Sequence, residues 1–325
     1  MKRRDFITLL GGAAAWPVAA AAQQPAMPVI GFLSPQSAIA SAHLLAAVRL
    51  GLNESGLIEG QNVAIEARWA EGRYDRLPAL AAELLHHPVT VLVASAPPAA
   101  VAARAATSTI PIVFSSGADP VRLGLVAGLN RPGGNITGVS HFSLALEAKR
   151  LEILHELIPD AARIAVLVNP TLPGAEAITD EMQAAARALG LKLHIVNASS
   201  EDDLDAAMAS IVGAAARGLV VASDPFFLSR RDRLVSAVAR RAVPAIYQFR
   251  EFAAAGGLVS YGANLAHEYR LVGVYAGRII RGEKPADLPV VQPSKFELVI
   301  NLTTAKALRL EVPPMLIARA DEVIE

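Results

Sequence analysis

Short apolar runs alternate with helix-length amphipathic segments along most of the chain. The apolar runs are rich in Val, Ile and Leu, and they occupy residues 29–33, 63–69, 89–94, 110–114, 163–168, 192–196, 218–222 and 245–247. Helical patterns lie between and after them, at residues 38–54, 73–85, 98–107, 144–157, 175–189, 202–212 and 231–241. Continuous apolar runs are typical of strands covered on both faces. The alternation predicts an α/β fold with parallel sheets and right-handed crossovers.

The alternation falls into two blocks, residues 28–116 and 160–247, and each block has enough units for its own doubly wound sheet. Between the blocks lies a loop-rich stretch, Gly117 to Ser140, with a Pro-Gly-Gly-Asn turn at 132–135. The remaining pattern is a strand at 256–262, a helix at 267–281, extended segments at 288–292 and 296–301, and a helix at 303–310. These pieces are too few for a third domain, so we expect them to complete the two lobes.

The N-terminus has the pattern of an export signal at residues 1–22. A basic start is followed by an apolar stretch and a small-residue end at Ala20 to Ala22. The pair Arg3-Arg4 before Asp5 resembles a twin-arginine signal. The alternative is a transmembrane helix, but the 17 residues from Phe6 to Ala22 are at the short edge of a bilayer span. We therefore expect a soluble protein exported to a bacterial periplasm.

Composition narrows the function classes. The chain has no cysteine, which excludes a disulfide, a thiol nucleophile and a lipid-acceptor cysteine. Without residues 1–22 the chain keeps 27 basic and 29 acidic residues, with no clustered basic face for a nucleic acid. No later segment is an uninterrupted apolar span, so we expect no membrane-embedded part.

Polar and aromatic residues gather where the predicted strands end. In open parallel sheets, ligands bind beyond the carboxyl ends of the strands. The candidate ligand-binding residues chosen on this ground are Ser34, Ser95, Ser115, Ser116, Asp119, Asn169, Asp224, Phe226, Tyr247 and Tyr261.

The chemistry of this set fits an α-amino acid lying across a cleft. Hydroxyls and helix N-terminal N–H groups suit a carboxylate, and Asp224 suits an ammonium group. Rings such as Phe226 can stack on an apolar part of the solute. The alternative for the serines, Asp119 and Asp224 is a helix N-cap, a position that Ser and Asp favour.

Enzyme and metal signatures are absent from the sequence. It has no G-x-S-x-G, G-x-G-x-x-G, Walker or H-E-x-x-H pattern. His86-His87 has no third ligand nearby, so we expect no metal site. We also expect no cofactor. A hydrolase stays open as an alternative, because catalytic triads are recognised by geometry rather than by sequence order.

Three segments carry a family resemblance: "SSGADPVRLGLVAGLNRPGGNITGVS", "IRGEKPADLP" and "LPVVQPSKFELVINLTTAKALRLEVPP". They resemble the exported substrate-binding proteins of ABC importers, specifically the group with tryptophan- and tyrosine-binding members. The resemblance covers essentially the whole chain after the leader. It implies a type I periplasmic-binding fold, in which two α/β lobes joined by three chain crossings close on a solute.

On this basis we expect crossings near residues 136–140, 257–261 and 289–293. Lobe one would then hold residues 28–138 and 257–290, and lobe two residues 139–256 and 291–325. The implied function is that of a monomeric solute-binding component that delivers an amino acid, or a similar amphipathic solute, to an ABC permease and its ATPase. The alternative is a periplasmic hydrolase or a sensor-partner protein that uses the same cleft.

Overall fold

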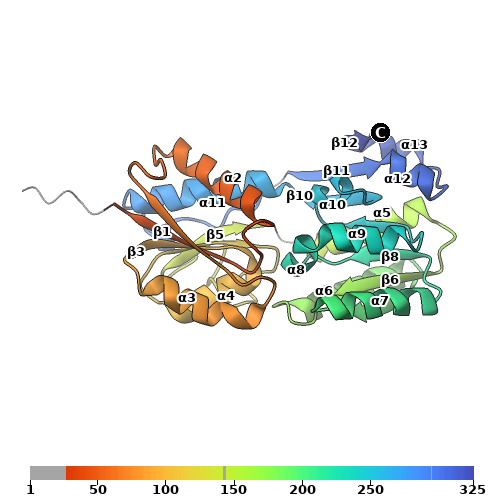
Figure 1. Ribbon diagram of the computed structural model, residues 1–325, viewed down its shortest axis with the longest axis horizontal. Helices are drawn as coiled ribbons and strands as arrows, with labels where there is room; N and C mark the ends of the chain where they lie inside the picture. The colour runs from red at the N-terminus through yellow and green to blue at the C-terminus, as the bar shows by residue number, and fades with distance from the viewer. Residues whose placement is uncertain (1–26, 142–143, 294) are drawn as a thin grey trace, which may run out of the picture.

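The computed structural model describes residues 27–141, 144–293 and 295–325. The expected export signal at residues 1–22 lies outside this part of the chain. Two α/β lobes lie end to end along the long axis of the molecule (Figure 1), each with its own sheet. This confirms the predicted fold class of two sheet-containing lobes.

Lobe one contains a five-stranded parallel sheet in the order β2-β1-β3-β4-β5. Its strands are β1 (Val29–Ser34), β2 (Ala64–Trp69), β3 (Val89–Ala94), β4 (Ile112–Ser116) and β5 (Ile136–Ser140). Helices α2 (Ala42–Glu54) and α11 (Leu265–Ile280) cover one face (Figure 1). The short helix η1 (Tyr74–Arg76), α3 (Leu77–Leu85) and α4 (Ala96–Ala106) follow on the other side.

Lobe two contains a seven-stranded sheet in the order β12-β11-β10-β9-β8-β6-β7. Its strands are β6 (Arg163–Val168), β7 (Lys192–Asn197), β8 (Gly218–Val221), β9 (Ala245–Tyr247), β10 (Val259–Ala263), β11 (Phe296–Asn301) and β12 (Glu322–Ile324). Only the β10–β11 pair among these strands is antiparallel. The helices of this lobe are α5 (Leu144–Leu157), α6 (Ala175–Ala188), α7 (Glu201–Gly213), α8 (Pro225–Ser229), α9 (Arg231–Ala239), α10 (Arg250–Ala254), α12 (Leu302–Ala307) and α13 (Pro314–Ala318).

Glycines allow two distant segments to form one face of lobe one. Helix α11 packs along α2, more than two hundred residues earlier in the chain. A Cβ atom on Gly273 of α11 would lie 2.1 Å from the carbonyl oxygen of Val48, and one on Gly51 would lie 1.9 Å from that of Arg270. Both helices therefore need glycine at this contact, because any side chain would collide with backbone.

Two of the three chain crossings lie later than predicted. Residues 136–140 are strand β5 of lobe one, so the first crossing follows Ser140. Residues 259–263 are strand β10 of lobe two, so the second crossing lies at Asn264, between β10 and α11. The sequence had placed 257–263 in lobe one and residues 139–140 in lobe two. A short buried run between glycines shows that a strand is present but not which sheet it joins.

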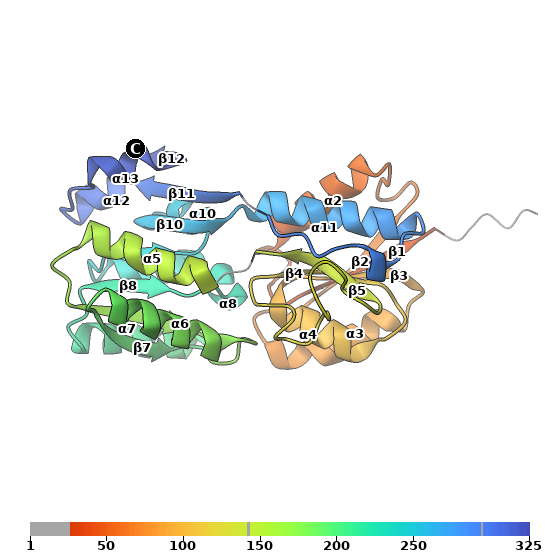
Figure 2. The same cartoon turned by 180° about the vertical axis from the view of Figure 1, so that it is seen from behind.

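The third crossing lies close to the predicted position, 289–293. Val290 and Val291 donate backbone hydrogen bonds to Leu129 and Gly138 of lobe one, and β11 then begins in lobe two at Phe296. Val291 therefore belongs with lobe one, although the prediction had assigned it to lobe two. The short connection η2 (Pro285–Asp287) precedes this crossing, which is visible from behind in Figure 2.

Candidate functional site

A pocket with a cavity volume of about 90 Å³ lies between the two lobes. Lobe one contributes residues after β4 and at the beginnings of α4 and α11, and lobe two contributes the beginnings of α6 and α8. The carboxyl ends of β4 and β8 lead directly into this pocket. Its position is the one that parallel sheets favour for ligands.

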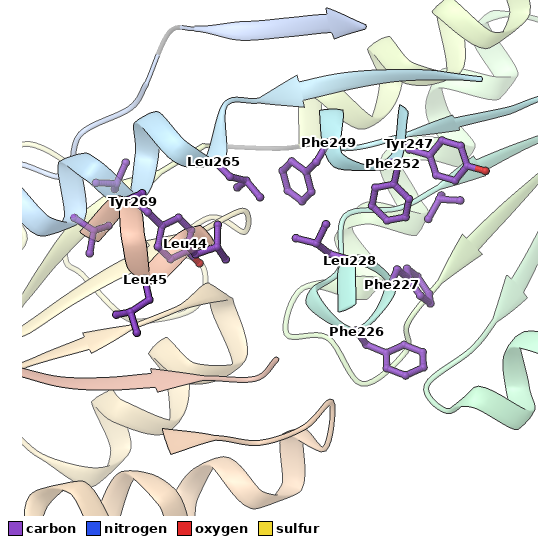
Figure 3. Close-up of a cluster of buried hydrophobic side chains, with 14 of the residues drawn as sticks. Leu44, Leu45, Phe226, Phe227, Leu228, Tyr247, Phe249, Phe252, Leu265 and Tyr269 are labelled. Atoms are coloured by element: carbon purple, nitrogen blue, oxygen red, sulfur yellow. The ribbon is translucent and has the colours of Figure 1, made fainter. Parts of the chain in front are cut away.

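Apolar side chains from both lobes face each other across the pocket. Leu44, Leu265 and Tyr269 project from lobe one, and Leu228 and Phe249 project from lobe two (Figure 3). All five belong to one hydrophobic cluster that runs through both lobes. The pocket therefore offers an apolar solute contacts from both sides.

Three of the ten predicted site residues line the pocket: Ser115, Asp119 and Asp224. The Ser115 hydroxyl donates a hydrogen bond to Glu268 Oε1 at 2.7 Å. Asp119 Oδ1 accepts from the N–H groups of Val121, at 2.9 Å, and Arg122, at 3.3 Å. Residues 120–124 form turns rather than a helix, so Asp119 stabilises a turn instead of capping a helix, and it borders the pocket.

Asp224 is a buried carboxylate with four protein donors. Oδ1 accepts from the N–H groups of Phe226, at 2.8 Å, and Phe227, at 3.2 Å, and so caps α8. Oδ2 accepts from the Tyr74 hydroxyl at 2.9 Å and from Asn169 Nδ2 at 3.1 Å. Burial raises the pKa of Asp224 to about 6, although these hydrogen bonds act in the opposite direction. Because a carboxylate accepts about four hydrogen bonds, its capacity is already used by the protein.

The predicted serines outside the pocket lining shape the loops around it. Ser34 Oγ accepts from the N–H of Gln36 at 3.2 Å, and Ser116 Oγ donates to the carbonyl of Ala118 at 2.8 Å. Ser95 Oγ lies 2.6 Å from the hydroxyl of Tyr269, which does line the pocket. Their hydroxyls therefore have partners within the protein.

Asn169 and the predicted aromatic residues do not line the pocket. Asn169 bonds to Asp224, as described, and accepts from Thr171. Phe226 packs on Phe227, Tyr247 stacks on Phe252 with ring centroids 4.8 Å apart, and Tyr261 lies 6.4 Å from the Phe296 ring. The rings at the pocket are instead those of Phe249, Tyr269 and His141, which the sequence analysis did not select.

His141 and Glu268 form a buried pair at the pocket wall. His141 Nδ1 lies 2.7 Å from Glu268 Oε2, and the His141 ring meets the Phe249 ring edge-on at 6.0 Å. Ser115 donates to the other oxygen of Glu268, so the order of contacts is hydroxyl, carboxylate, imidazole. A catalytic triad needs the hydroxyl to contact the imidazole. This geometry therefore gives no support to the hydrolase alternative.

A second buried pair, Glu147 and Arg150 of α5, supports the lobe-two side of the pocket. Arg150 donates to the Tyr261 carbonyl at 2.9 Å and to Ser223 Oγ at 3.1 Å. The Ser223 N–H donates to Glu147 Oε1 at 3.1 Å. Ser223 lines the pocket, so this pair fixes a hydroxyl that a solute can reach.

The described residues, 27–141, 144–293 and 295–325, contain neither a metal-binding cluster nor a membrane-spanning helix. No group of three or more His, Asp or Glu side chains in these ranges is arranged to hold a metal ion. No helix in the same ranges is long and apolar enough to cross a membrane.

Solved structures with the same architecture cover nearly the whole chain. A conserved domain protein from Vibrio cholerae O1 biovar El Tor is 26% identical, with a TM-score of 0.85 over 91% of this chain and 99% of that one. An ABC domain from Streptococcus pneumoniae in complex with L-Trp is 24% identical, with a TM-score of 0.83 over the same shares. A ligand-free, open substrate-binding protein from Clostridium difficile scores 0.65, over 92% of this chain and 99% of that one at 24% identity.

Sequence comparisons match one curated relative and one family model. The Tyrosine-binding protein of Clostridioides difficile strain R20291 is 27% identical over 264 residues, which cover 80% of this chain and 74% of the relative. The family model described as ABC transporter substrate binding protein matches residues 29–324. Since this match spans both lobes and all three crossings, the chain belongs to the family of ABC transporter substrate-binding proteins.

Proposed function

We propose that this protein is the exported solute-binding component of an ABC importer and that its solute is an amino acid with a large apolar side chain. The observation that carries the proposal is the pocket between the lobes, whose two sides are apolar and face each other. The tyrosine-binding relative and the structural relative with bound L-Trp support the choice of solute.

The pocket offers distinct partners to the two ends of an amino acid. The N-terminal end of α6, at Gly174, borders the pocket, and a helix N-terminus favours a carboxylate. Helix α4 also begins at the pocket, but Pro97 and Pro98 leave two of its first three residues without an N–H donor. Asp224 contributes negative charge for an ammonium group, but its hydrogen bonds go to the protein. Asp119 Oδ2 has no hydrogen-bond partner among the described residues, so it is the carboxylate oxygen best placed to accept from the ammonium.

Closure of the lobes, without chemistry, would be the mechanism. A solute between Leu265 and Phe249 is shielded from water only when the lobes come together, and its apolar contacts then stabilise that arrangement. The closed monomer would dock on a permease with its ATPase. Residues 1–22 would direct the protein to the periplasm by the twin-arginine route.

The test is a thermal-shift screen of protein lacking residues 1–22 against amino acids, sugars, nucleosides and aromatic acids. We expect L-tyrosine, L-tryptophan or another apolar amino acid to raise the melting temperature. At 100 times its dissociation constant, a solute adds about 2.7 kcal/mol to the free energy of unfolding. Each compound should be recovered unchanged after incubation. Stabilisation by sugars alone, or conversion of the compound, would contradict the proposal.

A further inference from the structure

We propose that Tyr74 and Asp224 form a latch between the two lobes, which makes Tyr74 a positioning residue that sets solute affinity from outside the pocket. The inference rests on the proposed function, because it assumes that a solute binds the closed arrangement. Tyr74 belongs to η1 of lobe one, and Asp224 is the N-cap residue of α8 in lobe two. Tyr74 does not line the pocket.

The Tyr74 hydroxyl makes two hydrogen bonds across the interface. It donates to Asp224 Oδ2 at 2.9 Å and accepts from the Phe226 N–H at 3.1 Å. Burial and the neighbouring Asp224 charge hold the pKa of Tyr74 well above its usual range, so the hydroxyl remains a donor at all physiological pH values. The ring packs against hydrophobic clusters belonging to both lobes. Tyr74 therefore contacts lobe two through both its ring and its hydroxyl.

The backbone beside Tyr74 also approaches lobe two closely. Gly72 has a φ of +84°, a conformation that glycine adopts without strain. A Cβ atom built on Gly72 would lie 3.3 Å from Cδ2 of Phe226. The loop thus reaches α8 at a point where it carries no side chain.

Other polar contacts between the lobes are longer. Outside the chain crossings, the described residues give a 3.5 Å hydrogen bond from Gln36 Nε2 to the Pro225 carbonyl and a 3.8 Å pair between His43 and Glu251. Of the four donors to Asp224, only Tyr74 comes from the other lobe. Opening the lobes would therefore remove this one donor and leave the α8 cap intact.

This arrangement couples the latch to solute affinity. The apparent affinity for a solute falls with the fraction of protein in the binding-competent arrangement. Hydrogen bonds to charged groups are among the stronger ones in proteins. Loss of the Tyr74 hydroxyl should lower the ratio of closed to open protein about tenfold.

Tyr74→Phe tests the latch, because it removes only the hydroxyl. The matched control is Tyr275→Phe, whose hydroxyl donates to the Pro289 carbonyl at 2.9 Å within lobe one. Because the chain has no cysteine, Ala105→Cys in α4 and Ala184→Cys in α6 place one spin label on each lobe. Both sites are exposed, on helices that lie on the same side of the molecule (Figure 2).

The first readout is the distance between the labels in solute-free protein, measured by pulsed EPR. We expect Tyr74→Phe to shift the distribution towards longer distances and Tyr275→Phe to leave it as in the parent protein. An unchanged distribution in Tyr74→Phe would overturn the latch. Circular dichroism verifies that both variants are folded.

The second readout is the affinity for L-tyrosine and L-tryptophan. We expect Tyr74→Phe to weaken binding by up to about tenfold, mainly through faster dissociation, and Tyr275→Phe to match the parent protein. If Tyr74→Phe lengthens the distance between the labels but leaves the affinity unchanged, Tyr74 does not have the proposed positioning role. If the parent protein binds neither amino acid, the proposed solute is wrong, and the solute-free distances still decide whether the latch exists.

Discussion

Asp224 and Ser115, which both border the pocket, each have more than one role in the protein. Asp224 was a candidate for either a ligand contact or a helix cap, and the structure shows it capping α8, bonding to Tyr74 across the interface and bordering the pocket. Ser115 similarly borders the pocket and holds Glu268. A residue type at a strand end indicates which chemistry is available, but its partners depend on segments far away in the sequence.

The raised pKa of Asp224 predicts a pH dependence of stability. Its ordinary value is 3.8 and its folded value is about 6, so the folded protein binds this proton more tightly than the unfolded chain does. The associated stability is fully present below pH 3.8 and is lost as the pH rises through 6, a change of about 3 kcal/mol.

Asp224→Asn removes this titration while it keeps an oxygen for the α8 cap. We expect the free energy of unfolding of the variant, relative to that of the parent protein, to increase by up to about 3 kcal/mol between pH 4 and pH 7. Urea unfolding at a series of pH values measures the difference. A difference that does not change with pH would contradict a raised pKa of Asp224 in the folded protein.

At the scale of elements, the alternation of strands and helices predicts most of the two sheets but not how late segments join them. Strand β10 and helix α11 were both predicted as elements, yet β10 pairs in lobe two and α11 packs in lobe one. Glu268 and Tyr269 were therefore not candidates, because nothing local places their helix against the pocket. The pattern of hydrophobic residues did not predict helix α8, because five residues are too few to show the 3.6-residue period of a helix.

The α2–α11 contact predicts that glycine is required within a helix. Gly273→Ala adds a Cβ atom that would lie 2.1 Å from the Val48 carbonyl, so we expect a loss of about 1–3 kcal/mol in the free energy of unfolding. The control is Gly213→Ala in α7, where an added Cβ atom would meet no other part of the protein within 4 Å, so alanine should be neutral or stabilising. Chemical unfolding compares the two variants. Equal free energies of unfolding for Gly273→Ala and Gly213→Ala would show that α2 and α11 can move apart without a loss of stability.

At the scale of the whole molecule, three crossings join two lobes whose apolar sides meet over the pocket. Each lobe keeps its own hydrogen-bonded sheet, so a change in the angle between lobes need not disturb either sheet. The interface combines an apolar pocket, which a solute can fill, with the Tyr74–Asp224 contact, which needs no solute. On the functions proposed above, solute binding and the direct contact between the lobes would favour the same closed arrangement.

Isothermal titration calorimetry of protein lacking residues 1–22 with L-tyrosine and L-tryptophan tests the central claim most directly. We predict saturable binding of one molecule of at least one of them, with a negative heat-capacity change from burial of apolar surface. Phe249→Ala, at the pocket, should weaken binding about tenfold or more, because it removes a ring that faces the solute, whereas Phe296→Ala, outside the pocket lining, should not. Absence of binding to both amino acids, or equal affinities of the parent and Phe249→Ala proteins, would contradict an amino-acid site between the lobes.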